Sequence, residues 1–162
     1  MVKFTQKWSF VSFLETVEEG QEFFWKDWPQ HVTIASVLSM DMTRDFIGQV
    51  EKLLLDYEVF LVEAESEGFW GINNDYHVML LKKSPEILFL HTELHELLIQ
   101  NGAVFNEPQF EGYGYVPHTT IQKDGRLNVG DTATVQSVNI IDMFPNAEGF
   151  QRKVVKTLEM KR

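Results

Sequence analysis

Alternation of apolar and polar side chains is the main signal along this chain, and it predicts a fold rich in strands. Residues two apart in a strand point to the same face, so short alternating or apolar runs between turn residues indicate strands. The segments with this pattern are 8–14, 31–38, 59–64, 76–81, 116–122, 133–143 and 152–158. Residues 15–27 and 65–75 contain helix-breaking or turn-forming residues such as Gly20, Gly68 and Gly71, and we expect both to be loops.

Two other segments have apolar residues at helical spacing. The first follows Asp41 and Thr43, either of which can cap exposed backbone N–H groups, and we expect this helix to end near residue 56. The second begins at residues 84–86, where Pro85 occupies the first turn, and ends at Asn101-Gly102.

The order of these elements indicates the fold class. Strands outnumber helices and do not alternate with them regularly, which favours an α+β fold with antiparallel sheets. A chain of 162 residues is long enough for one substantial core, so we expect a single domain over residues 1–162. The economical arrangement is bilobal: two pseudo-symmetric lobes whose antiparallel sheets line a central cleft, with two main helices outside.

Charge and composition narrow the function classes. The formal net charge of -10 argues against binding long nucleic acid through a basic patch, and against an anionic membrane surface. The chain has no cysteine, which excludes disulfides, thiolate nucleophiles and thiolate metal sites. Neither a signal peptide nor an apolar run long enough to cross a bilayer is apparent, so we expect a cytoplasmic protein, acting as a monomer.

One short pattern occurs twice and carries the chemistry. Residues 29–34 read Pro-Gln-His-Val-Thr-Ile, and residues 117–121 read Pro-His-Thr-Thr-Ile. On a strand, His31 and Thr33 point to one face, as do His118 and Thr120. Two such pairs facing one another would place two proton carriers and two hydroxyl donors around one small anion, which suits phosphoester chemistry.

Paired His-x-Thr motifs of this kind resemble those of the 2H phosphoesterase superfamily, which includes the 2′-5′ RNA ligase-like proteins and cyclic nucleotide phosphodiesterases. The resemblance implies a bilobal α+β fold and metal-independent opening of 2′,3′-cyclic or related phosphodiesters, with no cofactor. It also implies that His31 and His118 are the catalytic imidazoles and that Thr33 and Thr120 bind phosphate. The expected substrate is a small nucleotide or a short RNA end.

Other residues near the two motifs are possible substrate contacts. These are Phe10 on the strand beside the first motif, Trp28 in the loop before it, and Tyr115 and Lys123 on either side of the second motif. Packing explains each of the three aromatic residues equally well. His91 and His95 are four apart on a predicted helix, but the metalloprotease spacing of Glu93 is absent, so we interpret them as a solvated helix face and predict no metal site.

The residues leave three other functions open. The same cleft could run the reverse reaction and form 2′-5′ RNA linkages. It could bind a nucleotide or phosphate without turnover. Finally, the two His–Thr pairs could be a coincidence in a structural protein, in which case their imidazoles need not face one another.

Overall fold

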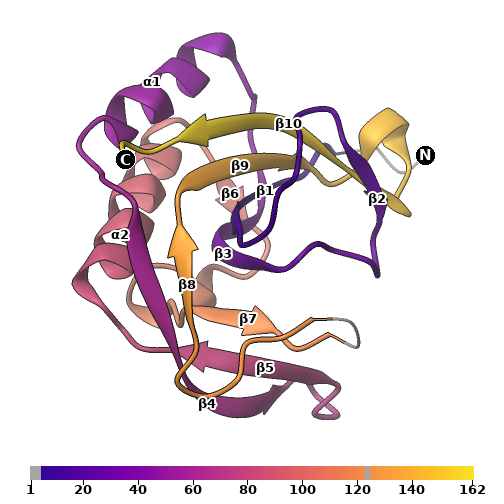
Figure 1. The fold of residues 1–162 in the computed structure, drawn as a ribbon. Helices are drawn as coiled ribbons and strands as arrows, with labels where there is room; N and C mark the ends of the chain where they lie inside the picture. Colours follow the sequence, from indigo (N-terminus) through magenta and orange to yellow (C-terminus); the bar gives the residue numbers. More distant parts are fainter. Residues whose placement is uncertain (1–4, 123–124) are drawn as a thin grey trace.

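The computed structural model describes residues 5–122 and 125–162, and Figure 1 shows their arrangement. The helices are α1 (Arg44–Leu54) and α2 (Pro85–Gln100). The strands are β1 (Trp8–Phe13), β2 (Glu22–Phe24), β3 (His31–Ser39), β4 (Phe60–Trp70), β5 (Tyr76–Leu81), β6 (Val104–Phe105), β7 (His118–Thr120), β8 (Thr132–Val135), β9 (Ser137–Asp142) and β10 (Gln151–Glu159).

These strands form two antiparallel sheets. The large sheet has the order β2-β10-β9-β1-β3-β6, and the small sheet has the order β7-β5-β4-β8. Figure 1 shows the large sheet above the small one, with both helices on the same side of the molecule. The predicted α+β class with antiparallel sheets is therefore confirmed.

The helices begin and end where the sequence signals place them. The Thr43 side chain accepts a hydrogen bond from the backbone N–H of Phe46, which caps α1. Pro85 occupies the first turn of α2, where its missing N–H leaves no intrahelical hydrogen bond unmade. Both helices bury one stripe of side chains, which has three residues in α1 and five in α2.

One apolar core joins the two sheets and the two helices. It includes Phe10 and Leu38 from the large sheet, Met79 from the small sheet, and Phe46 and Leu90 from the helices, all at most 1% exposed. A smaller apolar cluster, with Phe13 and Phe23 among its members, packs between β1, β2 and β10 on the opposite face of the large sheet. Burial of these side chains supplies most of the stability of the fold.

Several predicted boundaries are wrong. The expected single strand 133–143 is two strands, because the chain leaves the small sheet after Val135 and enters the large sheet at Ser137. Strand β4 continues through Gly68 to Trp70, where a loop is predicted, since pairing with β5 supports it. The predicted loop 15–27 contains β2, which is held at the sheet edge by β10. Strand β6 was not predicted.

No helix in the described part of the chain is both long enough and apolar enough to span a membrane.

Candidate active site

Each His–Thr motif lies in a different sheet, and the two sheets bring the motifs together. His31 and Thr33 are on β3, where His31 is opposite Phe13 of β1. His118 and Thr120 are on β7, the edge strand of the small sheet, where His118 is opposite Leu80 of β5. Cα atoms of β3 and β7 approach within 8 Å of one another.

Burial along both strands alternates. His31 and Thr33 are half-buried, while Val32 and Ile34 beside them are buried in the core. On β7, His118 and Thr120 are half-buried and Thr119 between them is 1% exposed. Each motif therefore turns its imidazole and its hydroxyl to one side of its strand and an aliphatic or interior side chain to the other.

The two imidazoles are held in the same way. His31 Nδ1 lies 2.8 Å from the carbonyl oxygen of Pro29, and His118 Nδ1 lies 3.0 Å from the carbonyl oxygen of Val116. In both cases the acceptor is two residues before the histidine. A carbonyl can only accept, so Nδ1 carries the proton in both rings and Nε2 carries the lone pair of the neutral form. Neither Nε2 has a hydrogen-bond partner among the described residues.

A tryptophan flanks each imidazole. The ring centroids of Trp28 and His31 are 4.7 Å apart, and those of Trp70 and His118 are 4.4 Å apart. Burial lowers the pKa of His31 to about 4; the hydrogen bond to Pro29 opposes this shift, and the charge of His118 adds to it. Burial also lowers the pKa of His118. Because both pKa values are lowered, both rings are neutral at pH 7 in the free protein.

The threonine hydroxyls of the motifs are available to a ligand. Neither the Thr33 nor the Thr120 hydroxyl takes part in a hydrogen bond in the described part of the chain. Both side chains are half-buried, so these hydroxyls are not sealed in the core. A bound oxyanion could therefore accept a hydrogen bond from each hydroxyl without breaking an existing one.

Two side chains tie the motif strands together. The Tyr115 hydroxyl donates to the carbonyl oxygen of Thr33 at 2.8 Å, and the Gln122 amide donates to the carbonyl oxygen of Trp28 at 2.7 Å. These bonds lie on either side of β7. They fix the second motif against the first, and sequence reasoning did not anticipate the role of Gln122, because a contact between residues so far apart leaves no local pattern.

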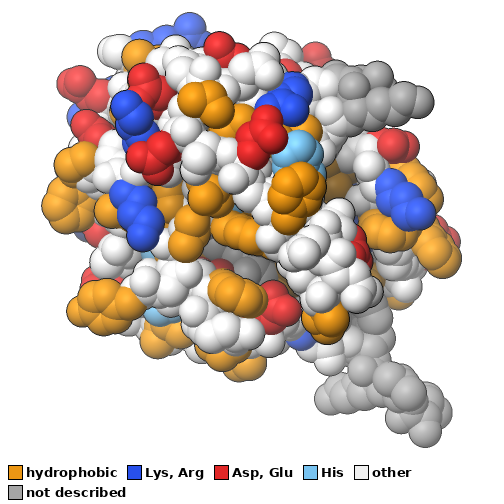
Figure 2. Space-filling view, turned by 90° about the horizontal axis from the view of Figure 1, so that it is seen from below, with side chains coloured by type: hydrophobic (Ala, Val, Ile, Leu, Met, Phe, Trp, Pro, Cys, Tyr) orange, Lys and Arg blue, Asp and Glu red, His pale blue; other side chains and the backbone are white. Residues whose placement is uncertain are grey.

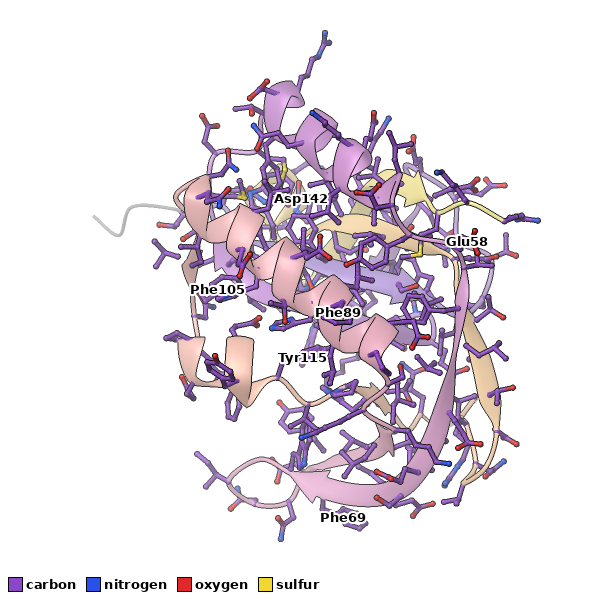
Figure 3. The ribbon with its side chains drawn as sticks, turned by 90° about the vertical axis from the view of Figure 1, so that its left-hand side faces the viewer. Glu58, Phe69, Phe89, Phe105, Tyr115 and Asp142 are labelled. Carbon is purple, nitrogen blue, oxygen red and sulfur yellow. The ribbon has the colours of Figure 1, made fainter. Side chains whose placement is uncertain are left out.

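A cleft of about 1070 Å³ opens beside the motifs. Its walls include one residue of each motif, Thr33 of β3 and His118 of β7, and also Tyr115, which is 7% exposed. The other two motif residues, His31 and Thr120, do not line this cleft. The β4–β5 hairpin contributes Trp70 and Tyr76 to the same cleft. Figure 3 shows Tyr115 below α2, between that helix and the small sheet, with Phe69 at the outer end of the small sheet.

The structure places the other candidate contacts in different surroundings. Tyr115 is a cleft wall whose hydroxyl is already bonded to the backbone. Trp28 lies beside His31, and it also packs against Phe23 with a centroid distance of 4.9 Å. Phe10 is wrong as a substrate contact, because it is 0% exposed and packs edge-on against a core aromatic residue. Lys123 lies outside the described residues.

His91 does not lie on a solvated helix face, contrary to the prediction. It is 1% exposed, its Nδ1 lies 2.7 Å from the carbonyl oxygen of Ile34, and its Nε2 accepts the backbone N–H of Gly112 at 2.9 Å. It therefore links α2, β3 and the turn before Tyr115. Within residues 5–122 and 125–162, no group of three or more histidine or acidic side chains could hold a metal ion.

A buried carboxyl beside His91 is a second feature that the sequence did not reveal. The Glu111 side chain is 6% exposed, and its Oε2 lies 3.7 Å from His91 Nε2 with no hydrogen-bond partner. Its other oxygen accepts a long bond of 3.4 Å from the Ser36 N–H. Burial raises the pKa of Glu111 to about 7, so this residue at the cleft wall changes charge near neutral pH.

The chain has the fold of the LigT-like phosphoesterases. A crystal structure of a phosphoesterase matches it with a TM-score of 0.63 and 15% sequence identity, over 98% of this chain and 100% of that chain. E. coli LigT in complex with 3′-AMP matches with a TM-score of 0.61 and 14% identity, over 98% of this chain and 100% of LigT. The protein TT0787 of Thermus thermophilus matches with a TM-score of 0.59 and 14% identity, over 96% of this chain and 98% of that protein.

These similarities concern the fold, because identities of this size do not carry an activity from one protein to another. No family model matches the chain. No curated protein matches it in sequence either. The fold that the two motifs led us to expect is thus confirmed.

Proposed function

We propose that this protein is a phosphoesterase that opens 2′,3′-cyclic or related cyclic phosphodiesters by acid–base catalysis with His31 and His118. The observation that carries the proposal is the matched pair of imidazoles. Each is held through Nδ1 by the carbonyl two residues before it, and each has Nε2 unbonded beside an unbonded threonine hydroxyl within the described chain. Two imidazoles with these properties, on strands of two sheets that approach one another, are the groups that a two-proton reaction at one phosphorus requires.

The reaction divides between the two rings. The neutral Nε2 of one histidine takes a proton from water, whose oxygen attacks phosphorus. The P–O bond to the ring oxygen of the cyclic ester breaks, and the other histidine gives its Nε2 proton to that leaving oxygen. The product is a phosphate monoester with a free hydroxyl. The arrangement is nearly symmetric, so it does not assign the base and the acid. If a 5′-hydroxyl of a second nucleotide replaced water as the nucleophile, the same proton transfers would form a 2′-5′ linkage, with the 3′-oxygen as the leaving group.

Substrate binding supplies the protonation state that the reaction needs. Both rings are neutral at pH 7 in the free protein, because burial lowers the pKa of each. A phosphodiester anion between them favours the charged form, which raises the pKa of the nearer ring. One proton is then held by the pair as a whole. Thr33 and Thr120 donate hydrogen bonds to the phosphoryl oxygens, where negative charge gathers in the transition state.

The fold is consistent with this chemistry. E. coli LigT has been crystallised with 3′-AMP and with phosphate, so a protein of this fold accepts a phosphate monoester. Such a monoester is the kind of product that opening a 2′,3′-cyclic nucleotide gives.

The experiment is a turnover assay on the four 2′,3′-cyclic mononucleotides, with product analysis to identify the ester bond that breaks. His31→Ala and His118→Ala should each lose about 10²- to 10⁴-fold in kcat. Because the two rings act as a unit, the double variant should be little slower than either single variant. His77→Ala is the matched control, since His77 precedes Val78, whose partner is Thr120, and therefore points to the other face of the small sheet.

Parental activity in either histidine variant, with circular dichroism unchanged, would overturn the proposed mechanism. Tight binding of nucleotide with no consumption of any cyclic phosphate would instead identify a binding module.

A further inference from the structure

The charges around the cleft restrict what can be attached to the reacting phosphate. The described residues that line the cleft include no lysine and no arginine, but they include the carboxyl side chains of Glu107 and Glu111. The rest of the lining is mainly apolar or aromatic, with Trp70, Tyr76 and Phe110 more than a third exposed. The whole chain has a net charge of -10, so the wider field of the protein has the same sign as these carboxyls.

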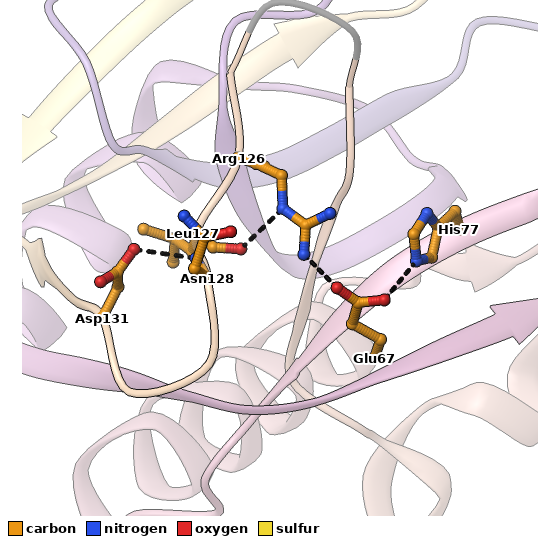
Figure 4. A network of polar contacts seen from close by, with 6 residues as sticks. All are labelled: Glu67, His77, Arg126, Leu127, Asn128 and Asp131. Carbon is orange, nitrogen blue, oxygen red and sulfur yellow. Dashed lines mark hydrogen bonds and ion pairs between the residues drawn. The ribbon is translucent and has the colours of Figure 1, made fainter.

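Arg126 is the described cation nearest in sequence to the second motif, and it does not offset the negative charge of these carboxyls. The Arg126 guanidinium is bound to the Glu67 carboxylate, whose other oxygen lies 3.0 Å from His77 Nε2, as Figure 4 shows. Glu67 is opposite Met79 in the β4–β5 ladder, whereas Val78 is opposite Thr120. Side chains alternate along a strand, so this network lies on the face of the sheet turned away from Thr120.

The space-filling view from the side of the small sheet agrees with this description. Hydrophobic side chains gather there among paired acidic and basic groups, and no broad basic patch is visible among the described residues of that face (Figure 2). Lys82, which follows β5, is likewise bound to the Glu63 carboxylate. Neither cation is therefore free to neutralise a second phosphate at the cleft.

We propose, on the basis of the function above, that this cleft selects cyclic phosphodiesters whose only charge is at the reacting phosphorus. A cyclic nucleoside monophosphate fits this description. A nucleotide with an additional 5′-phosphate, or an oligonucleotide with a cyclic end, does not. The hydroxyls and imidazoles of the motifs can bind one phosphoryl group, while a second phosphate would lie near Glu107 and Glu111 with no described cation beside it.

The test compares three substrates with the same reacting group: adenosine 2′,3′-cyclic phosphate, its 5′-phosphorylated form, and a trinucleotide with a 2′,3′-cyclic end. The singly charged substrate should have a kcat/KM about tenfold or more above the other two at low ionic strength. Added salt should narrow the gap, because salt screens exposed charges.

Charge reversal at the cleft provides the matched comparison. Glu107 is exposed at the cleft wall, so Glu107→Lys should raise several-fold the ratio of kcat/KM for the 5′-phosphorylated substrate to kcat/KM for the singly charged substrate. Glu51→Lys on α1, an exposed position that does not line the cleft, makes the same change in net charge and should leave the preference as it is.

Equal kcat/KM values for the three substrates, or the same effect from Glu51→Lys as from Glu107→Lys, would overturn the inference and leave the proposed function intact. If no cyclic phosphate is opened, the proposed function fails, and calorimetric binding decides the inference. Tighter binding of adenosine 3′-phosphate than of adenosine 3′,5′-bisphosphate would support it, whereas equal or weaker binding would overturn it.

Discussion

Replacement of Glu111 by glutamine should make the protein more stable at neutral and alkaline pH. The side chain is 6% exposed, and one of its oxygens has no hydrogen-bond partner within the described chain. Burial raises the pKa of the carboxyl from 4.5 to about 7 in the folded protein. The folded state therefore holds this proton more tightly than the unfolded state does. The stability that this proton contributes is fully present below about pH 4.5 and is lost as the pH rises through about 7.

The size of the effect follows from the two pKa values. One pKa unit corresponds to about 1.4 kcal/mol, so the full loss is on the order of 3 kcal/mol, and nearly all of it has occurred by about pH 7. Glutamine has a similar shape and never ionises, so it escapes this loss. Between about pH 5.5 and about pH 8, the unfolding free energy of Glu111→Gln should rise relative to the parent by about 2 kcal/mol.

The assay is urea denaturation followed by circular dichroism at several pH values from about 5.5 upward, since the pI of about 4.9 makes lower pH unsuitable for a soluble sample. Burial lowers the pKa values of His31 and His91 to about 4. These two residues therefore make the unfolding free energy of the parent rise with pH up to about 6.5, which opposes the effect of Glu111. The variant shares that trend, so only the difference between the two proteins is diagnostic. Glu107→Gln, an exposed change at the same cleft, should follow the parent. A pH-independent difference for Glu111→Gln would refute the reasoning.

Four further substitutions test other parts of the site. Thr33→Val and Thr120→Val should each lower kcat by about 10²- to 10³-fold in the cyclic nucleotide assay, because each removes a hydrogen-bond donor to the phosphoryl oxygens. The urea midpoint should be nearly unchanged, because neither hydroxyl has a partner within the described chain. A lowered urea midpoint that accounts for the lost activity would contradict this prediction. Gly114→Ala should destabilise the protein by about 1–3 kcal/mol or more in the same denaturation assay, since the added Cβ would lie 1.9 Å from a backbone carbonyl oxygen, and an unchanged midpoint would show that the turn can relax. Trp70→Ala should raise the pKa of His118 toward its ordinary value, because water can then reach the ring. An NMR titration of the His118 ring measures this pKa, and an unchanged value would mean that other groups bury this imidazole.

Features that depend on local periodicity were predictable from the sequence. The period of two along a strand places His31 with Thr33 and His118 with Thr120, and the buried residues between them fit the same period. Helix α1 begins after Thr43 as its capping signal indicates. The fold class followed from the order of the elements, so the architecture around the site was within reach.

His91 shows where a local signal was overlooked. The buried residues of α2 are Ile87, Leu90, His91, Leu94 and Leu98, which lie three or four apart on one stripe of the helix. His91 falls within that stripe, so helical spacing placed it in the core. Its polar atoms are satisfied there by the backbone of β3 and by the turn at Gly112.

Other parts of the site depend on contacts between distant segments, which no local pattern reveals. Gln122 reaches the backbone of Trp28, and Trp70 reaches His118 only because β4 continues past Gly68. The break between β8 and β9 has the same origin, since both halves have strand-like sequences and only their pairing partners differ. Tertiary pairing decides such features, and local propensity does not.

The central claim is that His31 and His118 hold one phosphate between them. The most direct test is an NMR titration with inorganic phosphate that follows the imidazole Cε1–H resonances, assigned with the single histidine variants. We predict that both resonances move along one binding curve and that phosphate raises the pKa of the pair. Movement of only one of the two resonances, or of neither at saturating phosphate, would contradict the account.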